Sequence, residues 1–194
     1  MKNRLILLTA MILLGFAVTA QKKYTLNESK SKLTVDGTST VHDWTINSTV
    51  FSGTAFFETE GDHPVSITDV RFVCKTDKIL SDNSIMDGKT HKALMADKHP
   101  EIIFIFNSVK SYNRLQDNFT GELIGTLSIA GKSKKIMVPF AGNVAPSGTL
   151  QIKGSVKFKM TDFGIDPPTA MLGALKTGDE VKINYDLHYV KSIN

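Results

Sequence analysis

The residues best suited to chemistry are five histidines, and their spacing forms no recognised catalytic or metal-binding pattern. They are His42, His63, His91, His99 and His188. No two have metal-ligand spacing, and the chain has no Cys-x-x-Cys pair, Walker loop, nucleophile elbow or dinucleotide fingerprint. A triad can assemble from distant positions, so an enzyme acting on lipid stays open as an alternative. The sequence nominates no catalytic residue, metal ligand or cofactor.

The single cysteine, Cys74, lies in the apolar strand pattern from Val70 to Lys75. One cysteine cannot form an internal disulfide. A nucleophilic thiol would need a histidine partner, and the sequence indicates none. We therefore interpret Cys74 as a small buried hydrophobic side chain.

Two local patterns each allow two interpretations. Trp44, the only tryptophan, follows His42 and Asp43, and it could form a ligand wall at a barrel mouth or plug the core. The segment from Asp162 to Pro168 ends in two prolines, which restrict its backbone. That rigid segment could form the rim of an opening or a structural corner.

Alternating apolar and polar residues predict mostly β structure. In Leu150 to Met160 the apolar residues share one face of a strand, and Val181 to Tyr189 repeats the pattern. The other strands are expected at 32–41, 44–57 with a bend or bulge at Gly53, 65–75, 101–110, 119–129 and 134–144. A helix is expected over Ser84–Lys98 and a second, short one over Thr169–Leu175. The fold class is therefore all-β, an antiparallel barrel of about eight strands with one or two short helices.

Two glycines, Gly121 and Gly125, share the apolar face of the 119–129 strand. Repeated inward glycine permits the sharp coiling that barrel closure needs, or it leaves space for something else. The sequence does not decide between these interpretations.

The N-terminus predicts export. Lys2 and Arg4 precede an apolar run of fourteen residues, Leu5 to Val18, and small residues follow as far as Ala20. The run is shorter than the roughly 20 residues of a membrane-spanning helix, although an uncleaved anchor is the alternative. We expect a signal peptide at 1–20, a barrel domain at 21–194, a periplasmic or secreted location, and no stable membrane insertion after cleavage.

The charge of the mature chain argues against nucleic-acid binding. Removing the signal takes two basic residues and no acidic one, so 21 basic and 19 acidic residues leave a net charge of +2. The densest basic cluster, Lys132, Lys134 and Lys135, falls at a predicted hairpin tip. We interpret it as solvated lysines rather than an anion or nucleic-acid patch.

Several motifs in shared order resemble the YceI-like family over Tyr24 to Val190. They are Val41-His42-Asp43-Trp44, the run Asp69 to Asn83, His99-Pro100-Glu101-Ile102-Ile103-Phe104, the strand and turn Gly121 to Lys132, and Asp162-Phe163-Gly164-Ile165. The resemblance implies a lipocalin-like barrel that binds polyisoprenoid or other long-chain lipid. The family's arginine and histidine positions are here Met86-Asp87-Gly88-Lys89 and Met160. That difference implies a more neutral ligand than a pyrophosphate lipid.

The expected function is therefore a carrier for an apolar small molecule such as an isoprenoid, a quinone or a fatty-acid-like lipid. A protein-interaction module that uses the barrel as a scaffold is the alternative, and a homodimer is a further expectation. The expected ligand-binding residues are Trp44, Phe104, Phe106, Leu123, Leu127, Leu150, Ile152, Val156, Phe158, Phe163, Val181, Ile183 and Tyr185. An open barrel interior would favour the carrier, and a solid one the scaffold.

Overall fold

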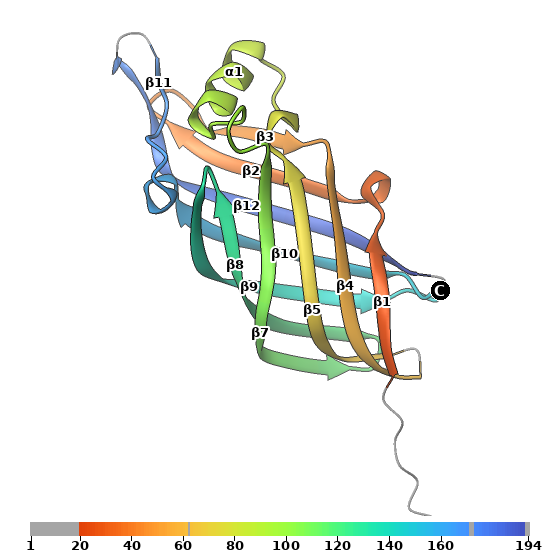
Figure 1. Cartoon of the computed structure of the whole chain (residues 1–194). Coiled ribbons are helices and arrows are strands. Elements are labelled where there is room, and N and C mark those ends of the chain that lie inside the picture. The colour runs from red at the N-terminus through yellow and green to blue at the C-terminus, as the bar shows by residue number, and fades with distance from the viewer. Residues whose placement is uncertain (1–19, 62, 171–172, 193–194) are drawn as a thin grey trace, which may run out of the picture.

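The computed structural model describes residues 20–61, 63–170 and 173–192. These residues form an all-β structure in which eight antiparallel strands close into a barrel, with one α-helix, α1, at one end (Figure 1). Closure comes from β1 (Ala20–Leu26), which pairs with β4 on one side and with the end of β12 on the other. The predicted signal peptide lies outside the described residues except for Ala20, the first residue of β1.

The barrel strands run in the spatial order β1, β4, β5, β7, β8, β9, β10, β12. After β1 their bounds are β4 Phe51–Glu60, β5 His63–Lys75, β7 Glu101–Leu115, β8 Asn118–Ile129, β9 Lys132–Val144, β10 Leu150–Lys159 and β12 Leu175–Lys191. Four of the eight neighbouring pairs, β4–β5, β7–β8, β8–β9 and β9–β10, are consecutive strands of the chain. The β8–β9 turn is a two-residue turn whose residues, Ala130 and Gly131, both have positive φ (49° and 78°), as a tight hairpin requires.

Short elements extend one end of the barrel, which we call the helix end. There β2 (Lys32–Ser39) pairs with β12 beyond the reach of β1, β3 (Trp44–Ser48) pairs with β2, and β6 (Ile79–Leu80) pairs with β3. Helix α1 (Ser84–Ala93) begins after Asn83, whose side chain accepts hydrogen bonds from the backbone N–H groups of Ile85 and Met86. This N-cap satisfies donors that have no partner within the helix.

The predicted fold class is confirmed, with corrections to individual elements. The 44–57 strand is two strands, β3 and β4, because the strand is interrupted at Thr49 and Val50. Beyond this break β4 pairs with β1 and β5 instead of with the partners of β3, and Gly53 pairs in register with Phe72 without a bend or bulge. The predicted helix at Thr169–Leu175 is wrong: β11 (Thr169–Ala170) pairs with Leu175 and Lys176 of β12. Pro167 and Pro168 hold the preceding backbone extended, which favours this hairpin. Helix α1 also ends at Ala93, before Lys98.

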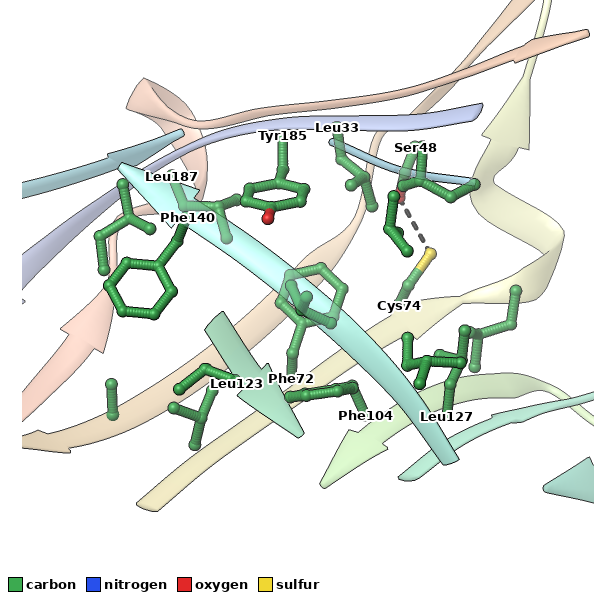
Figure 2. Close-up of a pocket in the computed structure, with 18 of the residues that line it drawn as sticks. Leu33, Ser48, Phe72, Cys74, Phe104, Leu123, Leu127, Phe140, Tyr185 and Leu187 are labelled. Carbon is green, nitrogen blue, oxygen red and sulfur yellow. Dashed lines mark hydrogen bonds between the residues drawn. The ribbon is translucent and has the colours of Figure 1, made fainter. Parts of the chain in front are cut away.

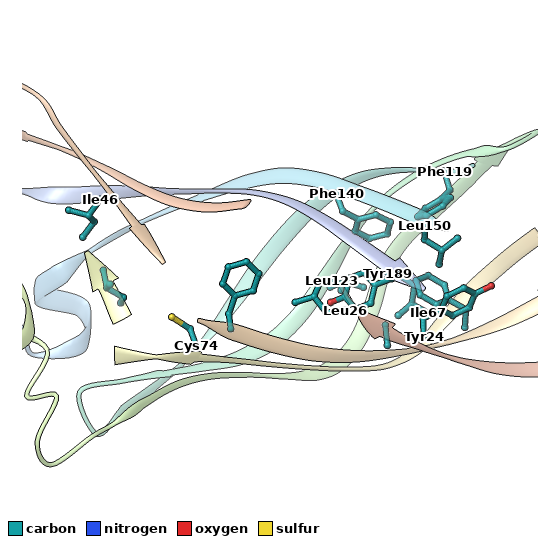
Figure 3. Packing of buried hydrophobic residues seen from close by; sticks show 14 residues of the cluster. Tyr24, Leu26, Ile46, Ile67, Cys74, Phe119, Leu123, Phe140, Leu150 and Tyr189 are labelled. Carbon is teal, nitrogen blue, oxygen red and sulfur yellow. The ribbon is translucent and has the colours of Figure 1, made fainter. Parts of the chain in front are cut away.

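An aromatic cluster closes the end of the barrel away from α1 (Figure 3). Phe119 is its centre: it stacks on Tyr112 at 5.7 Å between ring centroids and contacts Phe57 and Phe140 at 6.3 and 6.2 Å. The Tyr112 hydroxyl donates to the carbonyl of Pro64 at 3.0 Å, and burial raises the pKa of Tyr112 to about 12. This end of the barrel is therefore packed solid.

Inward glycines make room for aromatic rings on the neighbouring strands. A Cβ added to Gly125 would lie 2.1 Å from the ring of Phe104, and one added to Gly142 would lie 2.3 Å from the ring of Phe119. Gly121 likewise lies under Phe140. The question left open by the sequence is thus answered at these positions, because rings rather than empty space cover the glycines.

We therefore expect Gly125→Val to destabilise the barrel. The added side chain would meet both the Phe104 ring and the carbonyl oxygen of Ile105, which lies 2.8 Å from the added Cβ. Overpacking of this kind costs about 1–3 kcal/mol, measurable by urea denaturation. Combining it with Phe104→Ala should recover part of the loss, whereas simple additivity of the two substitutions would argue against the ring contact as the cause.

Candidate ligand-binding cavity

The barrel interior between the aromatic cluster and the helix end holds an apolar cavity of about 190 Å³. Phe72, Phe104 and Tyr185 converge on it from different strands (Figure 2). The full lining consists of Leu33, Val35, Ser48, Ala55, Phe57, Ile67, Val70, Phe72, Cys74, Ile79, Ile102, Phe104, Leu123, Leu127, Ile129, Ile136, Val138, Phe140, Ile152, Val156, Phe158, Ile183, Tyr185, Leu187 and Tyr189. We call this space the inner cavity.

The few polar groups of the inner cavity are largely occupied within the protein. The Ser48 hydroxyl and the Cys74 thiol lie 3.0 Å apart and share a hydrogen bond (Figure 2). The Tyr185 hydroxyl donates to the carbonyl of Pro139. Burial raises the pKa of Cys74, Tyr185 and Tyr189, so all three stay neutral at pH 7. The cavity thus presents uncharged, mainly hydrocarbon surface.

A second space of about 390 Å³, the outer chamber, continues from the inner cavity to the helix end. Both spaces touch Val35, Ile79, Ile102, Ile129, Phe158 and Ile183. The outer chamber adds polar and basic side chains to its wall: Ser39, His42, Asn83, Lys89, Thr90, Thr169, Lys176 and Thr177. The barrel therefore grades from an apolar interior to a mixed, partly basic opening.

Ten of the predicted ligand-binding residues line one of these spaces. They are Trp44, Phe104, Leu123, Leu127, Ile152, Val156, Phe158, Val181, Ile183 and Tyr185. The other three lie elsewhere. Leu150 is fully buried in the main core, Phe106 packs on that core, and Phe163 lies beneath Phe158 at 5.0 Å between ring centroids.

Sequence reasoning missed the walls contributed by β4, β5 and β9. These strands add Ala55, Phe57, Ile67, Val70, Phe72, Cys74, Ile136, Val138 and Phe140. The alternation Val70, Phe72, Cys74 was a usable signal, because period two places all three on one face. The lining residues of β4 carry a weaker signal, since its Phe56 and Phe57 are adjacent and only one of them can face inward.

The sequence left two interpretations each for Trp44 and for the segment from Asp162 to Pro168, and the structure shows where both lie. The Trp44 indole covers Gly37, donates to the carbonyl of Thr38 at 3.0 Å, and lines the outer chamber. Residues 160–163 form a short 3-10 helix, η3, with Phe163 in the core, and Ile165 and Pro168 line the chamber. Each segment is thus packed into the structure and also forms part of the chamber wall.

No metal centre is indicated in the described part of the chain. Among residues 20–61, 63–170 and 173–192, no group of three or more His, Cys, Asp or Glu side chains is arranged to hold an ion. Over the same residues, no helix has the length and apolar character needed to cross a bilayer.

Cys74 provides a chemical probe of the cavity, because its thiol is buried and the pKa of that thiol is raised. The thiolate is the reactive form, so at pH 8 we expect labelling by a maleimide to be much slower than in the unfolded chain. The rate should rise only as the pH exceeds the ordinary thiol pKa. Equal rates in the folded and urea-unfolded protein would contradict the buried placement.

Comparison with known proteins gives a consistent picture. The sequence model of one protein family, the YceI-like domain, matches residues 24–189 of this chain. The chain belongs to the YceI-like family. None of the curated proteins compared with it is a significant match.

Solved structures share the YceI-like fold at low sequence identity. BcnA of Burkholderia cenocepacia is 15% identical with a TM-score of 0.68, covering 84% of this chain and 98% of its own. A polyisoprenoid binding domain from Saccharophagus degradans, implicated in plant cell wall breakdown, is 12% identical with a TM-score of 0.65, covering 87% and 98%. A YCEI protein of Campylobacter jejuni is 19% identical with a TM-score of 0.59, covering 77% and 85%.

Proposed function

We propose that this YceI-like protein binds a long-chain apolar molecule, such as an isoprenoid, a quinone or a fatty-acid-like lipid, inside its barrel. The observation that carries the proposal is the inner cavity, an uncharged hydrocarbon-lined space continuous with a larger chamber at the helix end. Membership of the family and the shared fold with a polyisoprenoid binding domain support the same ligand class.

Burial of the chain would supply most of the affinity. Removing about 400 Å² of apolar ligand surface from water is worth on the order of 10 kcal/mol at roughly 25 cal/mol per Å². Loss of ligand freedom offsets a large share of that gain. Micromolar to nanomolar binding then needs no charged anchor, and we infer that the chain of the ligand lies in the inner cavity.

The polar end of the ligand would lie in the outer chamber. His42, Lys89 and Lys176 are on its wall, and Lys89 Nζ already donates to the carbonyl of Thr169 at 3.3 Å. Hydroxyl or carbonyl groups can accept hydrogen bonds from such side chains without leaving a buried charge unpaired. This arrangement favours an amphipathic molecule with a small polar end.

The open interior favours the carrier over the scaffold. A barrel used only as a scaffold needs no cavity, because side chains can fill an eight-stranded interior. The aromatic end of this barrel is filled in that way, but the half towards α1 is not. We propose no catalytic residue in the cavity.

Native mass spectrometry of the mature protein, purified without detergent, tests the proposal. We expect an apolar adduct of one molecule per chain, released by solvent and identified by lipid analysis. Trp44 gives an independent signal because it is the only tryptophan and lines the outer chamber, so its emission should change as an isoprenoid alcohol is titrated. A clean apo mass with no uptake in either assay would favour the scaffold.

We further propose that the chain is exported, with cleavage after Ala20 and a periplasmic or secreted product. The basic start and the short apolar run of the first twenty residues support this. N-terminal sequencing of the protein from cell fractions should give Gln21 as the first residue. An intact Met1 in a membrane pellet would instead indicate an uncleaved anchor.

A further inference from the structure

Two lysines from different elements come together at the opening of the outer chamber. The ammonium of Lys89 on α1 donates to the carbonyl of Thr169 on β11 at 3.3 Å, and α1 and β11 lie side by side at the helix end (Figure 1). Lys176 of β12 pairs in register with Thr169. Residues directly opposed in an antiparallel pair share one face, and all three residues line the chamber. Lys89 and Lys176 therefore contribute charge to the same part of its wall.

No carboxylate on the chamber wall balances these charges. Among the described residues, the lining includes Lys89, Lys176 and His42 and contains no Asp or Glu. Within the described part of the chain, neither lysine forms an ion pair. A concave site lined by charge of one sign focuses its field and attracts ligands of the opposite sign. The opening is therefore suited to an anion.

The acidic residues close to this wall are engaged elsewhere or face water. Asp87, the acidic residue of α1, accepts hydrogen bonds from the backbone N–H and the hydroxyl of Ser81, both at 2.7 Å. Asp179 of β12 likewise accepts from the backbone N–H and the hydroxyl of Thr161. Three further acids are exposed and do not line the chamber: Asp43, Asp82 and Asp166. Solvent screens these exposed charges, so the two lysines remain available to a ligand.

The basic opening leads into hydrocarbon-lined space along a single strand. On β12, Lys176 lies at the opening, Val181 and Ile183 follow on the wall of the outer chamber, and Ile183 also lines the inner cavity, as does Tyr189 further on. A long apolar chain seated in the inner cavity would thus present its end to the two lysines. This sequence of charge and then hydrocarbon matches a long-chain anion.

The donors at the opening fit a carboxylate better than a phosphate. Proteins commonly hold phosphate groups with the paired N–H donors of arginine or the free N–H groups of a helix N-terminus. No arginine is among the described residues that line either space, and the Asn83 side chain already occupies the N–H groups of Ile85 and Met86 at the start of α1. A carboxylate is a stronger acceptor for an ammonium than a neutral carbonyl is, so it can replace the Thr169 carbonyl as the partner of Lys89.

We propose that the outer chamber recognises the carboxylate of a long-chain fatty acid through Lys89 and Lys176, while the acyl chain lies in the inner cavity. The inference rests on the proposed function and narrows its ligand class to apolar chains that end in a single negative charge. The isoprenoid alcohol and other neutral ligands would bind through their chains alone.

Three ligands with the same chain separate the contribution of the end group from that of the chain. Dodecanoate, dodecanol and dodecyl phosphate are titrated into the mature protein at about pH 8, where a carboxyl group is ionised, and Trp44 emission reports binding because Trp44 lines the outer chamber. We expect dodecanoate to bind about 10-fold more tightly than dodecanol, and more tightly than dodecyl phosphate. Added salt should reduce the preference for the acid over the alcohol.

Removing the two charges should abolish that preference. In the double variant Lys89→Gln and Lys176→Gln, the amides can still donate to a hydroxyl, so affinity for dodecanoate should fall about 10-fold and affinity for dodecanol should change less than about 3-fold. The double variant Lys89→Arg and Lys176→Arg keeps both charges and should retain the preference. This rescue distinguishes recognition of the anion from a structural role of Lys89 between α1 and β11.

A matched control removes two charges from the same two elements. Lys92 on α1 and Lys182 on β12 line neither space, so the double variant Lys92→Gln and Lys182→Gln should keep the preference for dodecanoate.

The possible outcomes separate this inference from the proposed function. Equal affinity for dodecanoate and dodecanol, or an equal loss of preference in the two Gln double variants, would overturn carboxylate recognition and leave apolar ligand binding supported. Tightest binding of dodecyl phosphate would also overturn it and assign the opening to a phosphate group. Failure of all three ligands to bind would contradict the proposed function itself, and the inference with it.

Discussion

Replacing Val156 with Trp should greatly weaken binding of an apolar ligand while leaving the protein folded. Val156 is half-buried and lines the inner cavity from β10, so an indole there would occupy space that the ligand needs. Losing about 100 Å² of ligand contact costs roughly 2.5 kcal/mol, or about 70-fold in affinity. Native mass spectrometry of the protein titrated with the isoprenoid alcohol measures the effect, because the added tryptophan would overlap the emission of Trp44.

The matched control places the same side chain on the outside of the same strand. Lys157 is exposed and its surface ion pair with Glu180 is worth little, so Lys157→Trp should bind the ligand like the unaltered protein. Unchanged affinity in the Val156 variant, with circular dichroism confirming its fold, would place the ligand outside the barrel and favour a surface interaction module.

Replacing Phe119 with Ala should produce the largest loss of stability. Phe119 is only 2% exposed and contacts Tyr112, Phe57 and Phe140 at the closed end of the barrel. Removing a buried phenyl ring costs about 3–5 kcal/mol through lost burial and the void left behind. At about 2–4 °C per kcal/mol for a chain of this size, the melting temperature should fall by roughly 10 °C.

Phe119 lies outside the inner cavity, so its effect should be separable from ligand binding. At low temperature, where the variant remains folded, affinity for the isoprenoid alcohol should stay within about 3-fold of the unaltered protein. Leu115→Ala, on β7 but 77% exposed, serves as the control and should cost under about 0.5 kcal/mol. A loss below 1 kcal/mol for Phe119→Ala would show that the aromatic cluster does not hold this end closed.

The cavity walls also show which part of the site the sequence could predict. In β10 and β12 the alternation is regular, and it assigns to the inner face seven residues that line the inner cavity: Ile152, Val156, Phe158, Ile183, Tyr185, Leu187 and Tyr189. Leu150 obeys the same alternation but lies at the closed end, where Tyr189 and the aromatic rings fill the interior. Periodicity reports which face a residue occupies and does not report how far along the barrel that face is empty.

The amino-acid sequence determined the all-β class, the inward faces of the regular strands, the location of the helix and the family. Those properties depend on local periodicity, turn residues and motif order, which are written along the chain. Only the tertiary structure decided that β1 closes on β12, that one end is packed and the other open, and that β9 and β10 separate above Lys153. These properties depend on pairings between distant segments and on how the volumes of facing side chains add up, and no single segment of sequence carries that information.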